Sequence, residues 1–225
     1  MARLPRLYAE GVVQLVQVEL VPALLEDEQL AQFMYSVLSQ SVKEFEVDLH
    51  SWLFLNHEIY LLATPKHANS MAQLVQQLGR HLSSKLRQGK VFKRRYRSSL
   101  IQDKKWALPA MLWIESYLAS QGGNVVPEYW KWSSAGHHTG LSNVHHCLVH
   151  HADYWVIGNT PFERQQKYYA YFKEGVSPEQ SKQLREALTG QWVLGDADFL
   201  LRIEPTVSRR MRPRKRGRGV NTHSD

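Results

Sequence analysis

The residues of this sequence best suited to chemistry form a dense basic run with aromatic rings between the charges. Lysine and arginine neutralise phosphates, and aromatic faces stack on unpaired bases, so this combination is typical of single-strand recognition. The alternative is a solvated charged face. The run has a strand-like pattern, however, and like charges on a strand repel one another without a partner. Its cations are Lys85, Arg87, Lys90, Lys93, Arg94, Arg95 and Arg97, and its rings are Phe92 and Tyr96.

A second basic stretch occupies residues 208–225. It has too few apolar side chains to bury a core, so we expect a disordered arm that tracks phosphates or enters a groove. The DNA-binding residues predicted here are Arg209, Arg210, Arg212, Arg214, Lys215 and Arg216.

Histidines crowd residues 137–151 around Cys147, the single cysteine of the sequence. The spacing matches no common zinc finger, so a polar loop is favoured over a zinc site, and the role of the cluster is left open. One cysteine excludes a disulfide within the chain and suits a reducing cytosol. The candidate zinc ligands are His145, His146, Cys147, His150 and His151.

Alternating strands and helices must position these residues. Residue patterns predict, in order, a strand over Val12–Leu20, a helix over Glu26–Phe45, two strands within Val47–Thr64 with a turn near Asn56, a helix over Met71–Leu86, a strand over Val91–Ile101 and a helix over Trp106–Ala119. This order predicts an α+β fold, in which an antiparallel sheet carries helices on one face.

A small helical module is predicted to follow. Thr160-Pro161 and Ser177-Pro178 each place a capping hydroxyl before a proline, which marks a helix start, and a short third helix is predicted over Asp196–Ile203. The expected division is therefore 1–134 for the α+β domain, 135–207 for the helical module and 208–225 for the basic tail.

Composition restricts the class of protein. Hydrophobic residues make up 43% of the 225 residues and charged residues 22%, which predicts a packed globular core. The formal net charge of +7 favours a polyanionic partner. Polar residues interrupt the apolar start, and no stretch approaches the roughly 20 apolar residues of a membrane span. We expect a cytoplasmic, nucleoid-associated protein with no membrane contact.

Several motifs, in their order and spacing, resemble those of the REP-associated tyrosine transposases, a branch of the HUH-type single-tyrosine transposases. They are ARLPR, LNH followed by LLATP, LGR, VFKRRYRSSLIQD, YWKWSS, NTPFERQQKYYAYFKEG and RRMRPRKRGRG. The resemblance implies a ferredoxin-like HUH nuclease fold that binds hairpin-forming repeats. It also implies single-strand cleavage with Mg²⁺ or Mn²⁺, through a tyrosine that becomes joined to DNA.

The resemblance also implies particular site residues. The family's metal strand reads Asn-His-hydrophobic-His, which places the first ligand on His57 and the second on Ile59. Isoleucine offers no lone pair, and a lone histidine is a poor ligand for a hard cation. The family's N-terminal arm, which contacts bases beside the hairpin, matches Arg3 and Arg6.

The nucleophile position is altered as well. Alignment on YWKWSS places Trp113 where the family has tyrosine, and indole has no hydroxyl to attack a phosphate. Tyr117 lies one helical turn further on, where packing in the core is the simpler role. We therefore predict a DNA-binding protein, monomer or homodimer, with impaired cleavage. The alternatives are an active metal-dependent nuclease that uses Tyr117 or Tyr60, and a binder of structured RNA.

Overall fold

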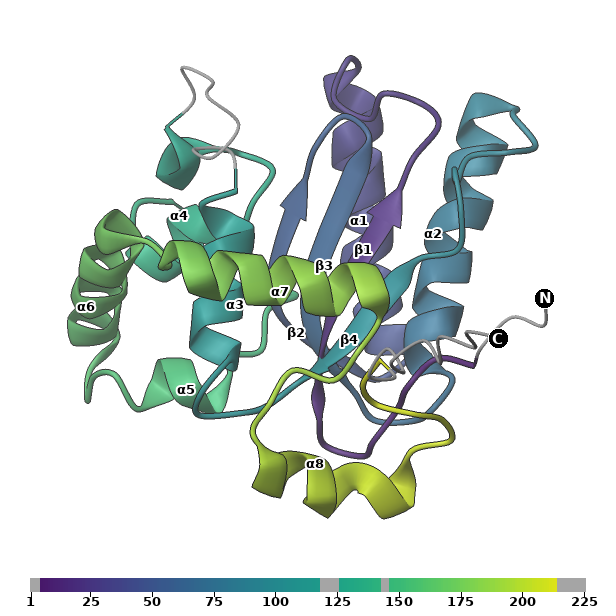
Figure 1. Cartoon of the computed structure of the whole chain (residues 1–225). Helices are drawn as coiled ribbons and strands as arrows, with labels where there is room; N and C mark the ends of the chain where they lie inside the picture. Colours follow the sequence, from purple (N-terminus) through teal and green to yellow (C-terminus); the bar gives the residue numbers. More distant parts are fainter. Residues whose placement is uncertain (1–4, 118–125, 143–145, 214–225) are drawn as a thin grey trace, which may run out of the picture.

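One antiparallel sheet lies at the centre of the chain (Figure 1). The computed structural model describes residues 5–117, 126–142 and 146–213. The sheet has four strands in the order β2-β3-β1-β4. Their bounds are β1 Val13–Glu19, β2 Val47–Phe54, β3 Glu58–Pro65 and β4 Arg97–Ile101. The α+β class and the antiparallel sheet are as the sequence predicts.

Two helices cover one face of the sheet. They are α1 (Glu28–Glu44) and α2 (Ser70–Leu86), which pack against each other and against the sheet side chains of Val16, Ile59 and Leu61. Because side chains alternate along a strand, the neighbouring residues Leu15, Tyr60 and Leu62 point to the opposite face.

That opposite face is covered too, which the prediction of helices on one face did not include. Helix α3 (Ala107–Glu115) packs on it, and α7 (Pro178–Gly190) runs across the strands (Figure 1). Leu53 and Tyr60 of the sheet share a buried apolar cluster with Tyr168 and Leu184. The first 134 residues and the helices that follow them therefore share one core, and the division at residue 134 stays a prediction.

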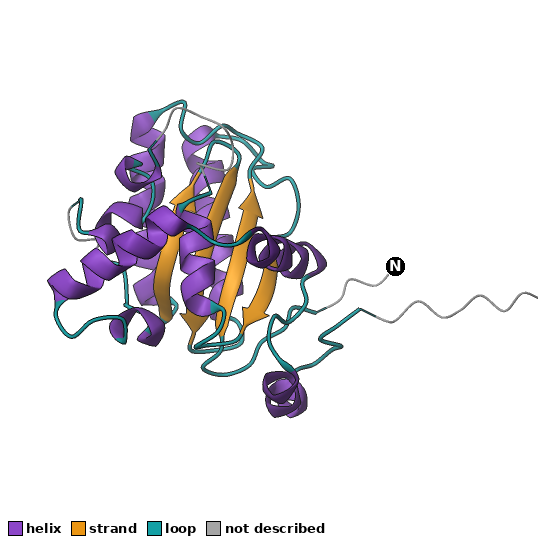
Figure 2. Cartoon of the chain, turned by 60° about the vertical axis from the view of Figure 1, so that its left-hand side comes forward, coloured by secondary structure: helices purple, strands orange, loops and turns teal. Residues whose placement is uncertain are grey.

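The predicted helix starts of the C-terminal region are present, and Figure 2 shows that helices lie on both sides of the sheet. The Thr160, Ser177 and Asp196 side chains each accept a hydrogen bond from a backbone N–H in the first turn, and Ser177 forms a full capping box with Gln180. The elements are η2 Pro127–Tyr129, α4 Ala135–Thr139, α5 Ala152–Trp155, α6 Pro161–Glu174, α7, α8 Ala197–Ile203 and η3 Glu204–Thr206.

Both edges of the sheet are paired with loop segments. At the β2 edge, Leu53 pairs with Ser133 and Leu49 with Leu148. At the β4 edge, Ile101 pairs with Leu194, whose N–H donates to Leu100 O at 2.8 Å. These pairings satisfy backbone groups that an edge strand otherwise leaves open.

The start of the basic tail is part of the fold. Met211 is buried in a small cluster with Leu7 and Phe199, and Arg209 Nε donates to Pro5 O at 2.7 Å. The expected disorder therefore does not begin at residue 208. Among the described residues, no helix combines the length and the apolar character needed to cross a bilayer.

Candidate functional site

A groove with a volume of about 880 Å³ lies between α2 and the segment that precedes β4. Four cations line it, which are Arg6, Arg80, Lys90 and Arg95. The last three are exposed, and the half-buried ring of Phe92 forms part of the wall. An open concave surface that combines positive charge with an aromatic ring has the chemistry of a site for a nucleic-acid backbone.

The groove exists because the chain leaves α2 and returns closely against it. Helix α2 ends at Leu86, and its C-cap Arg87 has a left-handed φ of 51°. Phe92 then packs on Gly79 so tightly that an added Cβ would lie 2.6 Å from the Phe92 ring. The predicted strand from Val91 is wrong for residues 91–96. Only Phe92 pairs there, with Leu20, and β4 begins at Arg97.

Several predicted DNA-binding residues are already engaged within the protein. Glu19 pairs with Arg94 at 3.1 Å and with Arg97 at 3.2 Å. Tyr96 is 7% exposed, and the Arg6 guanidinium lies 3.5 Å from the centre of its ring, so this ring has little face for a base. Lys93 is exposed, but its side chain is not in the groove wall.

Among the predicted DNA-binding residues of the N-terminal and C-terminal arms, some are likewise engaged within the protein and others are exposed. Arg209 donates to backbone carbonyls of Pro5, Gln191 and Arg210, and this ties the C-terminal segment to the N-terminal one. Arg210 and Arg212 are exposed. The remaining predicted contacts, Arg3, Arg214, Lys215 and Arg216, lie outside the described residues.

The strand that resembles the family's metal strand does not place His57 and Ile59 as a pair of metal ligands. His57 is exposed in the turn before β3, and Ile59 is fully buried in the core beneath α1 and α2. Neither side chain faces α3, so the structure does not bring the predicted ligand position and the predicted nucleophile position together. A lone exposed imidazole does not fit Mg²⁺ or Mn²⁺, which prefer oxygen ligands.

The strand residues that do face α3 are Glu58 and Tyr60. Glu58 accepts hydrogen bonds from Gln17 Nε2 at 2.8 Å and from the Tyr60 hydroxyl at 3.1 Å. Gln17 in turn accepts from the Arg97 guanidinium at 3.1 Å. Glu19 lies directly across from Glu58 in the sheet, but its carboxylate pairs with Arg94 and Arg97, and the Glu58 oxygens accept from neutral side chains.

Aromatic side chains fill the space between β3 and α3. Trp113 is buried, and its indole N–H donates to Ser181 Oγ of α7 at 3.0 Å. The Tyr117 ring lies 5.1 Å from Tyr60 and 5.6 Å from Trp113. Burial, together with hydrogen bonds to Tyr117 and Glu58, raises the pKa of the Tyr60 hydroxyl above its usual value. A phenol that resists deprotonation is a weak nucleophile.

The candidate zinc ligands that the structure describes do not meet in one cluster. The Cys147 thiol contacts the Tyr35 hydroxyl at 3.5 Å, His151 caps α5 and packs on His50, and His146 is exposed. His145 lies outside the described residues. The histidines that do converge are His137, His138 and His150. Their spacing in the sequence matches no motif, so only the fold could bring them together.

Comparison with solved structures shows what this arrangement is similar to. The structure of a REP-associated tyrosine transposase bound to a REP hairpin matches 64% of this chain and 89% of that chain, with a TM-score of 0.56 and 15% sequence identity. The chain has the REP-associated transposase fold. This fold was the one implied by the sequence motifs, and the TM-score confirms that implication.

A second solved structure is less similar to this chain. A crystal structure of a candidate transposase from Deinococcus radiodurans matches 53% of this chain and 98% of that chain at 14% identity, but its TM-score of 0.36 is too low to support a statement about this fold. No family model and no curated protein matches the chain.

Proposed function

We propose that this chain is a DNA-binding member of the REP-associated tyrosine transposase family, which recognises single-stranded or hairpin DNA and does not cleave it. The observation that carries the proposal is the groove lined by Arg6, Arg80, Lys90 and Arg95. Its ligand class is suggested by the shared fold, because the similar transposase was solved with a REP hairpin.

Binding would rest mainly on phosphate contacts. Lys90 and Arg95 are exposed and lie on the chain segment that crosses α2, while Arg80 faces them from the helix itself. Cations on two walls can contact successive phosphates of a bent or folded strand, and the Phe92 ring between them offers an edge to an unstacked base. Phosphate contacts set position and affinity, so sequence preference would need additional contacts.

Side chains on the sheet face opposite the groove support the proposal that the chain does not cleave DNA. The position that resembles the family nucleophile holds Trp113, whose only polar atom donates to Ser181. The nearby phenols of Tyr60 and Tyr117 pack against each other, and in-line attack tolerates only about 1 Å of misplacement before rate is lost. We therefore propose that binding is retained without strand transfer.

Two measurements on the whole 225-residue chain test this proposal. Equilibrium binding to a fluorescent single-stranded hairpin DNA is followed by anisotropy, and the same hairpin with a 5′ label is incubated with Mn²⁺ and run on a denaturing gel. We expect salt-sensitive binding and no covalent adduct. An adduct would overturn the non-cleaving part, and Tyr117→Phe and Tyr60→Phe would then identify the nucleophile.

The RNA alternative is decided by competition. An RNA hairpin of the same sequence should displace the DNA less effectively than unlabelled DNA does. Stronger displacement by RNA would contradict DNA as the partner, and binding that does not respond to salt would contradict a nucleic-acid partner altogether.

A further inference from the structure

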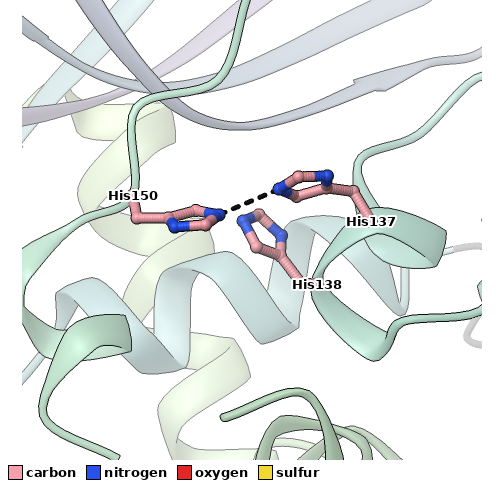
Figure 3. Close-up of side chains that lie close together, drawn as sticks. All are labelled: His137, His138 and His150. Carbon is pink, nitrogen blue, oxygen red and sulfur yellow. Dashed lines mark hydrogen bonds between the residues drawn. The ribbon is translucent and has the colours of Figure 1, made fainter. Parts of the chain in front are cut away.

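Three histidines from two segments converge beside the sheet (Figure 3). His137 and His138 lie on α4, and His150 lies in the segment just before α5. One ring nitrogen of each lies within 4.8 Å of the other two. The Nε2 atoms of His137 and His150 face each other at 2.9 Å.

A buried carboxylate orients one of these rings. Glu115 of α3 is fully buried and accepts from His138 Nδ1 at 2.7 Å. The same carboxylate accepts from the Tyr168 hydroxyl at 2.7 Å, from Ser51 Oγ at 3.0 Å and from Ser134 Oγ, so with His138 four side chains fix its position. This contact assigns the proton of His138 to Nδ1 and leaves Nε2 with a lone pair.

The Nε2 atom of His138 is the buried atom of the cluster that lacks a hydrogen-bond partner within the described part of the chain. The His138 side chain is completely buried, and Nε2 has no hydrogen-bond partner among the described residues. A buried polar nitrogen without a partner has lost its hydrogen bonds to water with no replacement, which destabilises the fold, and native structures rarely leave one in this state. A bound cation would supply the missing partner.

We propose that His137, His138 and His150 bind a first-row transition metal ion, with Zn²⁺ as the best fit, and that Glu115 positions His138 for it. Three neutral imidazoles suit Zn²⁺, Cu²⁺ or Ni²⁺ and not Mg²⁺ or Ca²⁺. A carboxylate that accepts from the second nitrogen of a histidine ligand is the usual outer support of such sites. This site is separate from the groove and does not depend on the proposed function.

Metal binding would require the three rings to move, because their nearest nitrogens are 2.9 Å apart and the widest pair, at up to 4.8 Å, would have to close by as much as about 1.5 Å. Ligand nitrogens about 2.0–2.1 Å from a tetrahedral zinc lie about 3.3 Å apart, so the rings of His137 and His150 would separate slightly, and their direct hydrogen bond would be replaced. His150 is only half-buried, which leaves room for a water as fourth ligand.

Two charged side chains beside the histidines, Arg164 and Glu115, have opposite effects on cation binding. Arg164 is buried behind Trp155, with its guanidinium 3.9 Å from the centre of that ring, while Trp155 packs edge-on against His150. Arg164 also donates to Gly158 O at 3.0 Å. Its charge disfavours a second cation, and the Glu115 carboxylate, in direct contact with His138, offsets that effect.

The metal would join two segments that both pair with the β2 edge. Ser133, just before α4, pairs with Leu53, and Leu148, just before His150, pairs with Leu49. A metal held by His138 and His150 would cross-link these two segments. Because only the folded chain brings the ligands together, metal binding would stabilise the folded state over the unfolded one.

The test is Zn²⁺ binding to the whole 225-residue chain after treatment with a chelator and without DNA. Zn²⁺ is titrated in competition with a chromophoric chelator, and the bound metal is counted by atomic emission. We expect one Zn²⁺ per chain. His150→Gln removes a half-exposed ligand and should weaken Zn²⁺ affinity by more than about 100-fold, while Glu115→Gln should weaken it by about 10–100-fold.

His146→Gln is the matched control, because His146 is exposed in the same region but lies outside the cluster. It should bind Zn²⁺ like the wild type. Circular dichroism checks that each variant is folded. If Glu115→Gln fails to fold, His150→Gln still decides the matter. No stoichiometric Zn²⁺, or equal affinity in wild type and His150→Gln, would overturn the proposal.

Discussion

Removing the charges of Lys90 and Arg95 together changes the groove with little risk to the fold. Both side chains are exposed at the groove, and neither forms an ion pair within the described part of the chain. The double variant Lys90→Ala/Arg95→Ala therefore removes two of the four groove cations. We expect it to fold normally and to bind hairpin DNA more weakly.

The magnitude follows from counterion release. Each phosphate neutralised on a single strand contributes about −0.7 to the slope of log affinity against log salt. Four groove cations predict a slope near −2.8, so affinity should fall about 50-fold between 50 and 200 mM salt. The double variant should show a slope near −1.4 and a fall of only about 7-fold.

Fluorescence anisotropy at four or five salt concentrations measures both slopes. Lys182→Ala/Arg185→Ala is the matched control, because it removes the same charge from exposed positions on α7, away from the groove. Its slope should equal that of the wild type. Equal slopes for wild type and the groove variant, or an equal change in the α7 control, would refute the assignment of the groove as the DNA site.

Three further predictions concern the fold. Burial lowers the pKa of His50 to about 4, so the stability that the neutral ring contributes is present above pH 6.5 and is lost as pH falls from 6.5 to about 4. The free energy of unfolding should fall by about 3 kcal/mol over this range because of His50. Urea unfolding at pH 7 and pH 4.5 measures this fall, and His50→Gln should abolish the part that His50 causes. Arg209→Ala should lower the free energy of unfolding by about 1–2 kcal/mol, because its hydrogen bond to Pro5 O is lost, and should leave the salt dependence of DNA binding unchanged. A weaker salt dependence in this variant would instead show that Arg209 contacts DNA. Tyr60→Phe should cost about 1–2 kcal/mol in urea unfolding, since Glu58 loses a donor, and an unchanged midpoint would contradict that role for the hydroxyl.

Local signals in the sequence predicted most of the elements. The apolar spacing of α1 and the capping hydroxyls of Thr160 and Ser177 act within one or two turns, so they could be read without knowledge of the fold. The strand predicted from Val91 failed because tertiary packing on Gly79 draws Phe92 towards α2, and no local pattern contains that contact.

The arrangement around β3 shows a different limit. The period of a β-strand places His57 and Ile59 on one face and Glu58 and Tyr60 on the other. Which of these two sets meets α3 was not predictable, because it depends on the side from which the helix returns to the sheet. The ring contacts of Tyr60 with Trp113 and Tyr117 decide it.

The pairing of Leu148 and Ser133 with β2, and of Leu194 with β4, has a consequence for self-association. Two copies of a chain often join by laying one strand beside another so that a single sheet continues across both. Here that route would first require the chain to displace its own loops from each rim. Any homodimer should therefore meet through helices, and its far-ultraviolet strand signal should not rise with protein concentration.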